Sequence, residues 1–240
     1  MDILLLRFDA PLMSFGHVAV DHHRPTGLFP TLSMLTGLLA NALGWRRTDT
    51  DRHQRLQERL RLAARIDRRG SLLRDYQSVD LGQPFLLDAG WTTRDRMEER
   101  SGAEQNKTGT HLRYRYYWAD CRTTVAVALA PPDEPPTLDD LAAALRAPAR
   151  PIFLGRKSCL PAGPILLGRQ EADSLRGALE AVEAAVEAQG DAMPAVWPAS
   201  EGGGDDEGIC WDLRDWANQV HTGSRRVRYG TVRPPRRSHA

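Results

Sequence analysis

The sequence predicts a mixed α+β protein whose first 170 residues follow the order β-α-β-β-α-β, the ferredoxin-like (RRM-like) arrangement. Three observations lead to this prediction: an apolar strand opens the chain, two leucine-striped helices start at threonines, and β-branched runs lie between them. The chain of 240 residues is long enough for one large domain with an appendage. We expect the large domain over residues 1–170 and the appendage over residues 171–240. In this arrangement one face of the sheet is free of helices.

The first half of the predicted domain contains a strand, two helices and a bent segment. Ile3–Phe8 is apolar and is predicted to form a strand. Residues 31–43 carry leucines at helical spacing after a threonine that can cap the helix. Asp51–Ala64 shows the same spacing with arginines on the other side. Residues 65–79 are strand-like around Gly70, so we expect a bent strand or a hairpin there.

The second half returns to strand patterns. Tyr114–Leu129 is rich in β-branched and aromatic residues, which favour strands. Residues 131–136 contain four prolines and are expected to form a stiff connector, and residues 137–146 predict a helix capped by Thr137. Residues 151–167 predict a hairpin interrupted by glycines.

The predicted appendage and one insertion complete the chain. A helix over residues 173–189 precedes a glycine-rich loop and two short strands, Ile209–Leu213 and Arg226–Thr231, followed by a basic tail. Thr92–Leu112 is polar throughout and has almost nothing apolar to bury. A long polar segment inside a compact domain is usually functional or disordered.

The charge of the chain is nearly balanced, with a net charge of +1, but its distribution is not. Of 32 basic residues, 30 are arginines; ten lie in residues 45–74 against four acids, and six lie in residues 225–237 with no acid. This clustering suits a protein with one side that faces a polyanion. A genome composition that favours arginine would account equally well for the high number of arginines, although it explains their clustering less well.

The cysteines and the apolar runs indicate the compartment. Three widely spaced cysteines fit no disulfide framework and no metal-ligand spacing, which favours a reducing cytoplasm. No apolar run approaches the roughly 20 residues of a membrane span. The first residues read as a strand and not as a signal peptide.

Four stretches carry a resemblance to a known family. Residues 24–33 read R-P-T-G-L-F-P-T-L-S and lead into a Gly/Leu/Ala helix, residues 73–76 read L-R-D-Y, and residues 153–159 read F-L-G-R-K-S-C before a Pro/Gly segment. Residues 11–16 read P-L-M-S-F-G, with Phe15 where a tryptophan is expected. In this order and spacing the motifs resemble the CRISPR-associated CasD family of the RAMP superfamily.

The resemblance implies a structural role in an RNA-guided complex. CasD-like subunits of type I-E Cascade complexes hold the repeat-derived 5′ handle of the guide RNA (crRNA) and cap the backbone subunit. The resemblance therefore implies crRNA, the backbone subunit and the large subunit as partners, target DNA as an indirect partner, and no cofactor, metal or catalytic residue. The polar stretch 92–112 stands where that family has a protruding thumb. The alternative is a metal-independent endoribonuclease, as in related subtype I-C subunits, assembled from Lys107, His111 and Tyr117.

The candidate RNA contacts combine hydroxyls, glycines, cations and rings. Gly155 lets backbone N–H groups converge on a phosphate, with Arg156 and Lys157 adding charge. Interleaved arginines and tyrosines are typical of single-strand readers, although alternate rings of a strand point to opposite faces. Arg24 is either a phosphate ligand or an ion-pair partner, and Phe15 either stacks on a base or lies in the core. The expected contacts are Ser14, Gly16, His17, Arg24, Thr26, Ser33, Arg74, Tyr76, Lys107, His111, Arg113, Arg115, Tyr117, Gly155, Arg156, Lys157 and Ser158.

Overall fold

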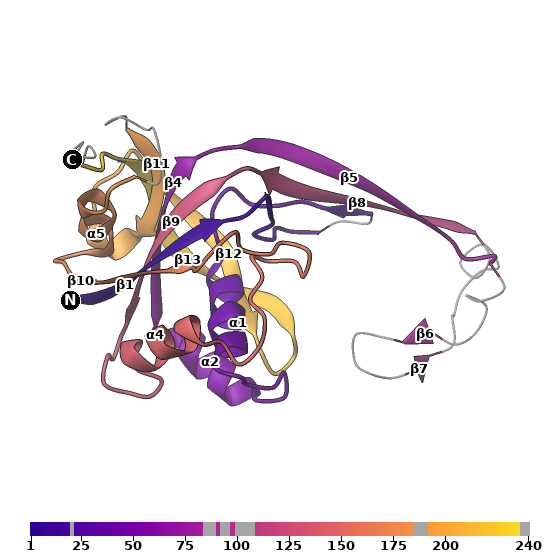
Figure 1. The fold of residues 1–240 in the computed structure, drawn as a ribbon, viewed down its shortest axis with the longest axis horizontal. Helices are drawn as coiled ribbons and strands as arrows, with labels where there is room; N and C mark the ends of the chain where they lie inside the picture. Colours follow the sequence, from indigo (N-terminus) through magenta and orange to yellow (C-terminus); the bar gives the residue numbers. More distant parts are fainter. Residues whose placement is uncertain (20–21, 84–89, 92–96, 99–108, 185–191, 236–240) are drawn as a thin grey trace.

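The protein is an α+β structure built on mainly antiparallel sheets, in which β3 and β8 form a parallel pair, seen here in a computed structural model (Figure 1). The structure describes residues 1–19, 22–83, 90–91, 97–98, 109–184 and 192–235. Over these residues the strands form a seven-stranded sheet, a four-stranded sheet and a two-stranded pair. No helix in the described part of the chain is long and apolar enough to cross a membrane.

The seven-stranded sheet has the order β10-β1-β9-β4-β11-β13-β12, with antiparallel neighbours throughout. Its strands are β1 (Asp2–Asp9), β4 (Leu60–Arg68), β9 (Arg122–Leu129), β10 (Leu166–Glu171), β11 (Met193–Pro198), β12 (Asp206–Asp215) and β13 (Val220–Val232). Because β11 pairs with β4, the C-terminal strands continue the sheet that the N-terminal half begins. The division of the chain into two domains at residue 170 stays a prediction.

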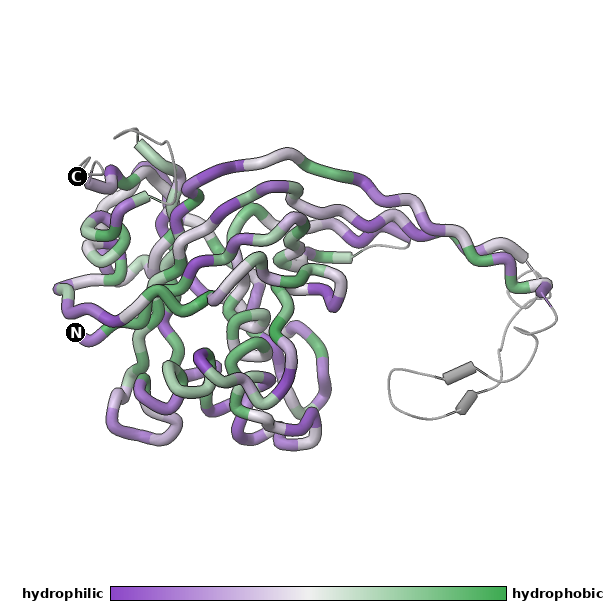
Figure 2. Tube along the Cα trace, in the orientation of Figure 1, coloured by the Kyte–Doolittle hydropathy of each residue, from purple (hydrophilic) through white to green (hydrophobic). Residues whose placement is uncertain are grey.

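Helices pack on both faces of this sheet, because the side chains of its strands alternate between the faces. Leu4, Leu6 and Phe8 of β1 lie in a core with α1 (Leu32–Ala42), α2 (Thr50–Arg59) and α4 (Leu138–Arg146). The alternate residues of β1, Ile3 and Leu5, pack with α5 (Leu175–Ala181). The expectation of a helix-free face is therefore wrong. Figure 2 shows the hydrophobic residues gathered in this body of the molecule.

The predicted helix caps are confirmed. The Thr31 hydroxyl accepts a hydrogen bond from the backbone N–H of Met34 at 3.2 Å, and α1 ends before Gly44, whose φ is +78°. Thr137 and Asp140 form a reciprocal capping box at the start of α4. The helix predicted over Asp51–Ala64 is too long, since it ends at Arg59 and the chain enters β4 at Leu60.

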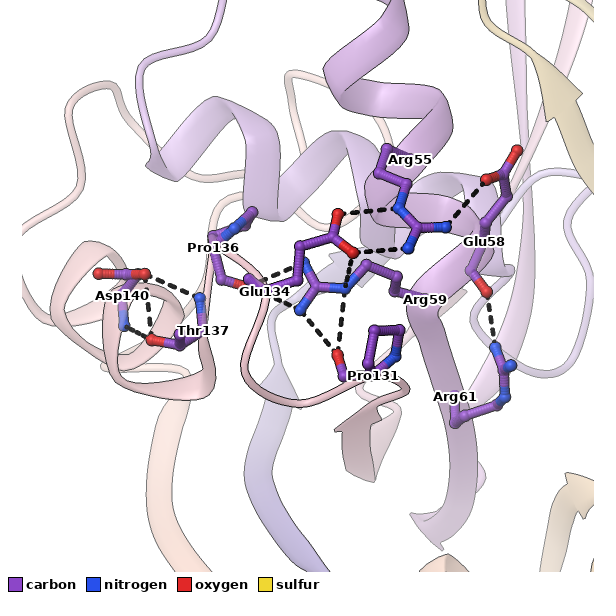
Figure 3. A network of polar contacts seen from close by, with 9 residues as sticks. All are labelled: Arg55, Glu58, Arg59, Arg61, Pro131, Glu134, Pro136, Thr137 and Asp140. Carbon is purple, nitrogen blue, oxygen red and sulfur yellow. Dashed lines mark hydrogen bonds and ion pairs between the residues drawn. The ribbon is translucent and has the colours of Figure 1, made fainter.

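Arg59, the last residue of α2, is buried and fixes the proline-rich connector that leads to α4 (Figure 3). Its guanidinium donates to the carbonyl of Pro131 at 2.9 and 3.2 Å, to that of Pro136 at 3.2 Å, and to that of Glu134. On the surface, Arg55 donates from Nε to the Glu134 carboxylate at 2.8 Å. These contacts tie the C-terminal end of α2 to the loop beside it.

The four-stranded sheet departs from the body as a long ribbon (Figure 1). In it β5 (Ser71–Asp80) pairs with β8 (Thr110–Ala119) in continuous register, and β2 (Leu12–Met13) and β3 (His23–Arg24) flank β8 near the body. We call β5, β8 and β3 the arm. Two short strands, β6 (Gly90–Trp91) and β7 (Met97–Glu98), pair beyond it. Most of the predicted thumb, residues 92–96 and 99–108, lies outside the described residues.

The bent segment around Gly70 joins the two sheets. Because β4 pairs with β9 and β5 pairs with β8, residues 65–79 are a bent strand and not a hairpin. Gly70 has φ +65°, and a Cβ there would lie 2.1 Å from the carbonyl oxygen of Ala119. The strand predicted over Tyr114–Leu129 is likewise divided at Asp120, which has φ +54°, into β8 and β9 of different sheets.

Two further expectations need correction. Residues 151–165 form a loop, and β10 pairs with β1, so the predicted hairpin is absent. The loop contains three prolines, which lack the backbone N–H that a strand ladder needs. At the C-terminal end α5 stops at Ala181, and the strands are longer than predicted. Of the basic tail, Arg225, Arg226 and Arg228 lie in β13 and pair with acids of β12.

Candidate nucleic-acid interface

A groove of about 730 Å³ brings together several of the predicted contacts. It lies between the N-terminal loop 14–19, the first turns of α1, the loop around Gly155, and the hairpin formed by β12 and β13. Of the predicted contacts, its lining includes Ser14, Gly16, His17, Ser33, Gly155 and Arg156. Predicted contacts that are up to 142 residues apart in the sequence therefore share one surface.

Gly155 is required by close packing at the floor of this groove. Its φ is +100°, and a Cβ on it would lie 1.6 Å from the carbonyl oxygen of Ser14. The Ser14 N–H in turn donates to the carbonyl of Leu154 at 3.2 Å. The glycine-rich loop is thus fastened to the N-terminal loop, and the phosphate nest expected there stays a prediction.

Arg156 joins the groove to the arm. Its guanidinium donates to the backbone carbonyls of Tyr116 at 3.0 Å and Arg24 at 2.7 Å, and it lies 4.7 Å above the ring of Tyr117. These contacts hold the cation in a fixed place at the groove wall. They also give Arg156 a structural role in addition to the predicted RNA contact. Lys157 and Ser158, next in the loop, are exposed.

The loop that carries His17 is held in shape by the predicted contact Thr26. The Thr26 hydroxyl accepts a hydrogen bond from the N–H of Phe15 at 2.9 Å, and Gly27 N–H donates to the carbonyl of Gly16 at 2.9 Å. Phe15 is buried in the core, so of its two alternatives the core position is the correct one and stacking on a base is not. His17 is exposed at the groove. Ser33 is buried beside Thr31, with its hydroxyl 3.5 Å from that of Thr31.

One carboxylate in the groove is neutralised internally. Asp212 of β12 is buried and accepts a hydrogen bond from the N–H of Leu32, the first residue of α1, at 2.8 Å. The same carboxylate pairs with Arg225 at 2.9 Å. A helix N-terminus and a guanidinium both stabilise a negative charge. The cations Arg156 and Arg214 therefore dominate the charge of the groove lining.

One face of the arm is a platform of rings and a cation, which we call the aromatic face: His23, Arg74, Tyr76, Tyr114 and Tyr116. The His23 and Tyr114 rings stack at 5.0 Å between centroids, and Tyr76 lies 5.5 Å from Tyr114. Arg74 lies 5.5 Å from the centroid of Tyr114. These residues come from three adjacent strands in register, with Tyr76 opposite Tyr114 and Arg74 opposite Tyr116. Tyr76 is 55% exposed, so its ring is available to a ligand.

The opposite face of the arm holds His111, Arg113, Arg115 and Tyr117, which alternate with the tyrosines above. Tyr117 is only 4% exposed beneath Arg156. A buried ring cannot stack on a base, so the structure does not support Tyr117 as an RNA contact. Arg113 is 3.3 Å from the Nδ1 of His22, and His111 is exposed.

Comparison with known proteins gives the family. A family model described as CRISPR-associated protein (Cas_Cas5) matches residues 3–228. The chain is also 34% identical over 184 residues to the CRISPR system Cascade subunit CasD of Escherichia coli (strain K12), covering 73% of this chain and 75% of the relative. The chain belongs to the CasD/Cas5 family. The resemblance inferred from the motifs is confirmed.

Solved structures agree with this membership. A chain of a CRISPR RNA-guided surveillance complex superimposes with a TM-score of 0.71 and 27% identity, covering 97% of this chain and 91% of that chain. A second structure, described as a crystal structure of Cas protein, matches with a TM-score of 0.63 over 98% of both chains. Its 24% identity supports the fold alone.

The structure also adds residues to the candidate interface of this CasD/Cas5 family member. Trp211, Arg214, Trp216 and His221 of the β12–β13 hairpin line the groove, and His23 joins the aromatic face. Their signal in the sequence is weak, because isolated aromatic and basic residues in a strand are usually packing residues. Lys107 lies outside the described residues.

The arginine cluster of residues 45–74 does not form a single basic surface. Arg59 and Arg65 are fully buried. Arg65 of β4 pairs with Asp67 at 2.6 Å and donates to the carbonyl of Val182 at 2.8 Å, at the end of α5. Two members of the cluster are therefore structural, and the charge that reaches solvent is smaller than the composition implies.

Proposed function

We propose that the chain is a non-catalytic subunit of a type I-E Cascade complex that binds the 5′ handle of crRNA and caps the backbone subunits. In this role it contacts the backbone and large subunits, meets target DNA only through the assembled complex, and works in the cytoplasm. The succession β1, α1, β4, β9, α4, β10, with sheet order β10-β1-β9-β4, supports a ferredoxin-like RAMP core. The CasD relative is a Cascade subunit by name, which supports the assignment to such a complex.

The observation that carries the proposal is the aromatic face of the arm. Single-stranded RNA is bound through bases stacked on aromatic rings and phosphates paired with arginine, and this needs no base pairing. Tyr76, Tyr114 and His23 supply the rings, and Arg74 the cation, on one sheet surface. The groove supplies further cations close by, because Arg156 links it to β8 and β3.

The endoribonuclease alternative is not favoured. His111 and Tyr117 lie on one continuous strand, six residues apart. At about 3.3 Å per residue, their Cα atoms are roughly 20 Å apart, too far to act on one phosphate. Tyr117 is also buried. A ribonuclease set of these two residues would require β8 to be broken.

The test compares RNA binding by the complex with RNA binding by arm variants. The complex is reconstituted with wild-type chain, and its affinity for handle RNA is measured against a scrambled RNA of the same length. Tyr76→Ala and Arg74→Ala should each weaken handle binding, Tyr76→Ala by about 1–3 kcal/mol. Arg74→Ala should also reduce the salt dependence, because one phosphate contact is lost.

The matched control is Val79→Ala, which alters an exposed residue of the same strand on the opposite face. It should leave RNA affinity unchanged. A complex that binds handle and scrambled RNA equally well would refute the proposal. Incubation with repeat RNA, with EDTA or magnesium, should produce no cleavage; a cut abolished by His111→Ala would promote the nuclease alternative.

A further inference from the structure

Trp211 projects from the edge strand β12 at the rim of the groove. Its side chain is 67% exposed, although a tryptophan gains more from burial than almost any other residue. The groove that it lines also holds Arg156, Arg214, His17 and His221. None of the contacts that stabilise the described fold explains why a ring of this size is left in solvent.

A β-bulge aims this side chain. In the ladder between β12 and β13, Cys210 faces Arg225 and Leu213 faces Gly223. Two residues, Trp211 and Asp212, thus stand opposite the single residue Ser224. Bulges are concentrated beside functional sites, where they redirect a side chain.

Asp212 anchors the bulge to the body of the protein. Its carboxylate is held by the first N–H of α1 at 2.8 Å and by Arg225 at 2.9 Å. Because Asp212 is buried and held by these two partners, the backbone at its neighbour Trp211 is held beside the groove. The backbone that carries the ring is thus held in place, so a ligand that stacks on the ring has only the side chain to order.

The chemistry around Trp211 favours a nucleotide over a protein side chain. An exposed indole beside guanidinium groups is the pattern of single-strand binding, in which rings take bases and arginines take phosphates. Among the described residues that line the groove, Asp212 is the one carboxylate, and its charge is balanced by its two partners, which weakens its repulsion of a phosphate. The groove volume of about 730 Å³ lies within the usual range for small-ligand sites.

We propose that Trp211 is a stacking platform for one base of the bound single-stranded RNA, whose neighbouring phosphates lie toward Arg156 in the groove. This inference rests on the proposed function and gives the RNA a second point of attachment, separate from the aromatic face of the arm. The two attachment points are joined by Arg156, which lines the groove and donates to the backbone of the arm.

The experiment measures affinity of the full chain for the handle oligonucleotide and for variants of it with one abasic position each. Trp211→Ala should weaken binding roughly five- to 150-fold, and Trp211→Phe should retain part of the affinity. The loss should be the same factor at low and high salt, because stacking releases no counterions. For one position in the oligonucleotide, the abasic RNA should bind the wild-type protein more weakly than intact RNA does. The same abasic RNA should bind the Trp211→Ala variant as well as intact RNA binds that variant.

Ile209→Ala is the matched control. Ile209 lies on the same edge strand and is 61% exposed, but it does not line the groove. Its replacement should leave RNA affinity unchanged. Should Trp211→Ala bind RNA as wild type does while Tyr76→Ala loses binding, the stacking proposal fails and the proposed function stands. Normal RNA binding combined with lost complex assembly in both Trp211→Ala and Ile209→Ala would identify β12 as a protein-docking edge instead.

Discussion

Replacing Arg59 tests how the proline-rich connector is held. Arg59→Met keeps a long unbranched side chain but removes every hydrogen-bond donor from the carbonyls of Pro131, Glu134 and Pro136 (Figure 3). Each hydrogen bond to a charged donor contributes about 1.5–3 kcal/mol, and such contributions overlap when they share one group. We therefore expect the free energy of unfolding to fall by about 3–5 kcal/mol. For a chain of this length that corresponds to a decrease in Tm of about 6–20 °C.

Urea unfolding followed by circular dichroism measures this loss. Arg59→Lys should fall between wild type and Arg59→Met, because an ammonium keeps the charge but cannot span three carbonyls. Arg55→Ala is the control, since it removes the exposed partner of the same Glu134 and should change the midpoint little. If Arg59→Met unfolded at the wild-type midpoint, the connector would be held by backbone contacts alone and the reasoning would be wrong.

Two further outcomes follow from burial and packing. Gly155→Ala should destabilise the protein by at least about 2 kcal/mol in thermal unfolding, because the added Cβ would meet the Ser14 carbonyl at a positive φ. The control Gly163→Ala, with nothing within 4 Å of its Cβ, should match wild type. Equal stability of the two variants would contradict this prediction. Burial, together with Asp212, raises the pKa of the Cys210 thiol from 9.0 to about 11, so iodoacetamide should modify Cys210 slowly at pH 8 in native protein and readily in urea. Since the folded-state pKa is the higher one, stability should fall as pH rises from 9 to 11, and Cys210→Ser should flatten that fall; an unchanged slope would exclude Cys210 as its cause.

Local interactions made the helix starts and the first strand predictable. Thr31 and Thr137 cap their helices through contacts within three residues, so the signal lies entirely in neighbouring sequence. The end of α2 was not predictable in this way. Leu56, Leu60 and Ala63 repeat at helical spacing, yet Leu60 and Ala63 belong to β4, where pairing with β9 and burial on both faces outweigh local propensity.

The loops of the candidate site that carry sequence motifs were predictable, but the residues that pack against them from elsewhere in the chain were not. Ser14 and Gly155 belong to motifs that are distinct in the sequence, and the fold brings them into contact. Trp211 is one aromatic residue in a strand, and only the bulge and the anchored Asp212 beside it give it a special place. Tyr117 shows the opposite case. It belongs to a segment whose composition suited RNA binding, but its ring lies beneath Arg156.

The central position of β4 has a consequence for biosynthesis. One edge of β4 pairs with β9, but the other pairs with β11, which begins at Met193. At about 5–20 residues per second, the ribosome needs roughly 6–25 s to make the 125 or so residues that separate the two strands. During that interval the nascent chain presents an unpaired strand edge, which is a template for association with other chains. A ribosome that stalls before residue 193 would therefore release an aggregation-prone fragment, and early chaperone binding would protect the growing chain until β11 completes the sheet.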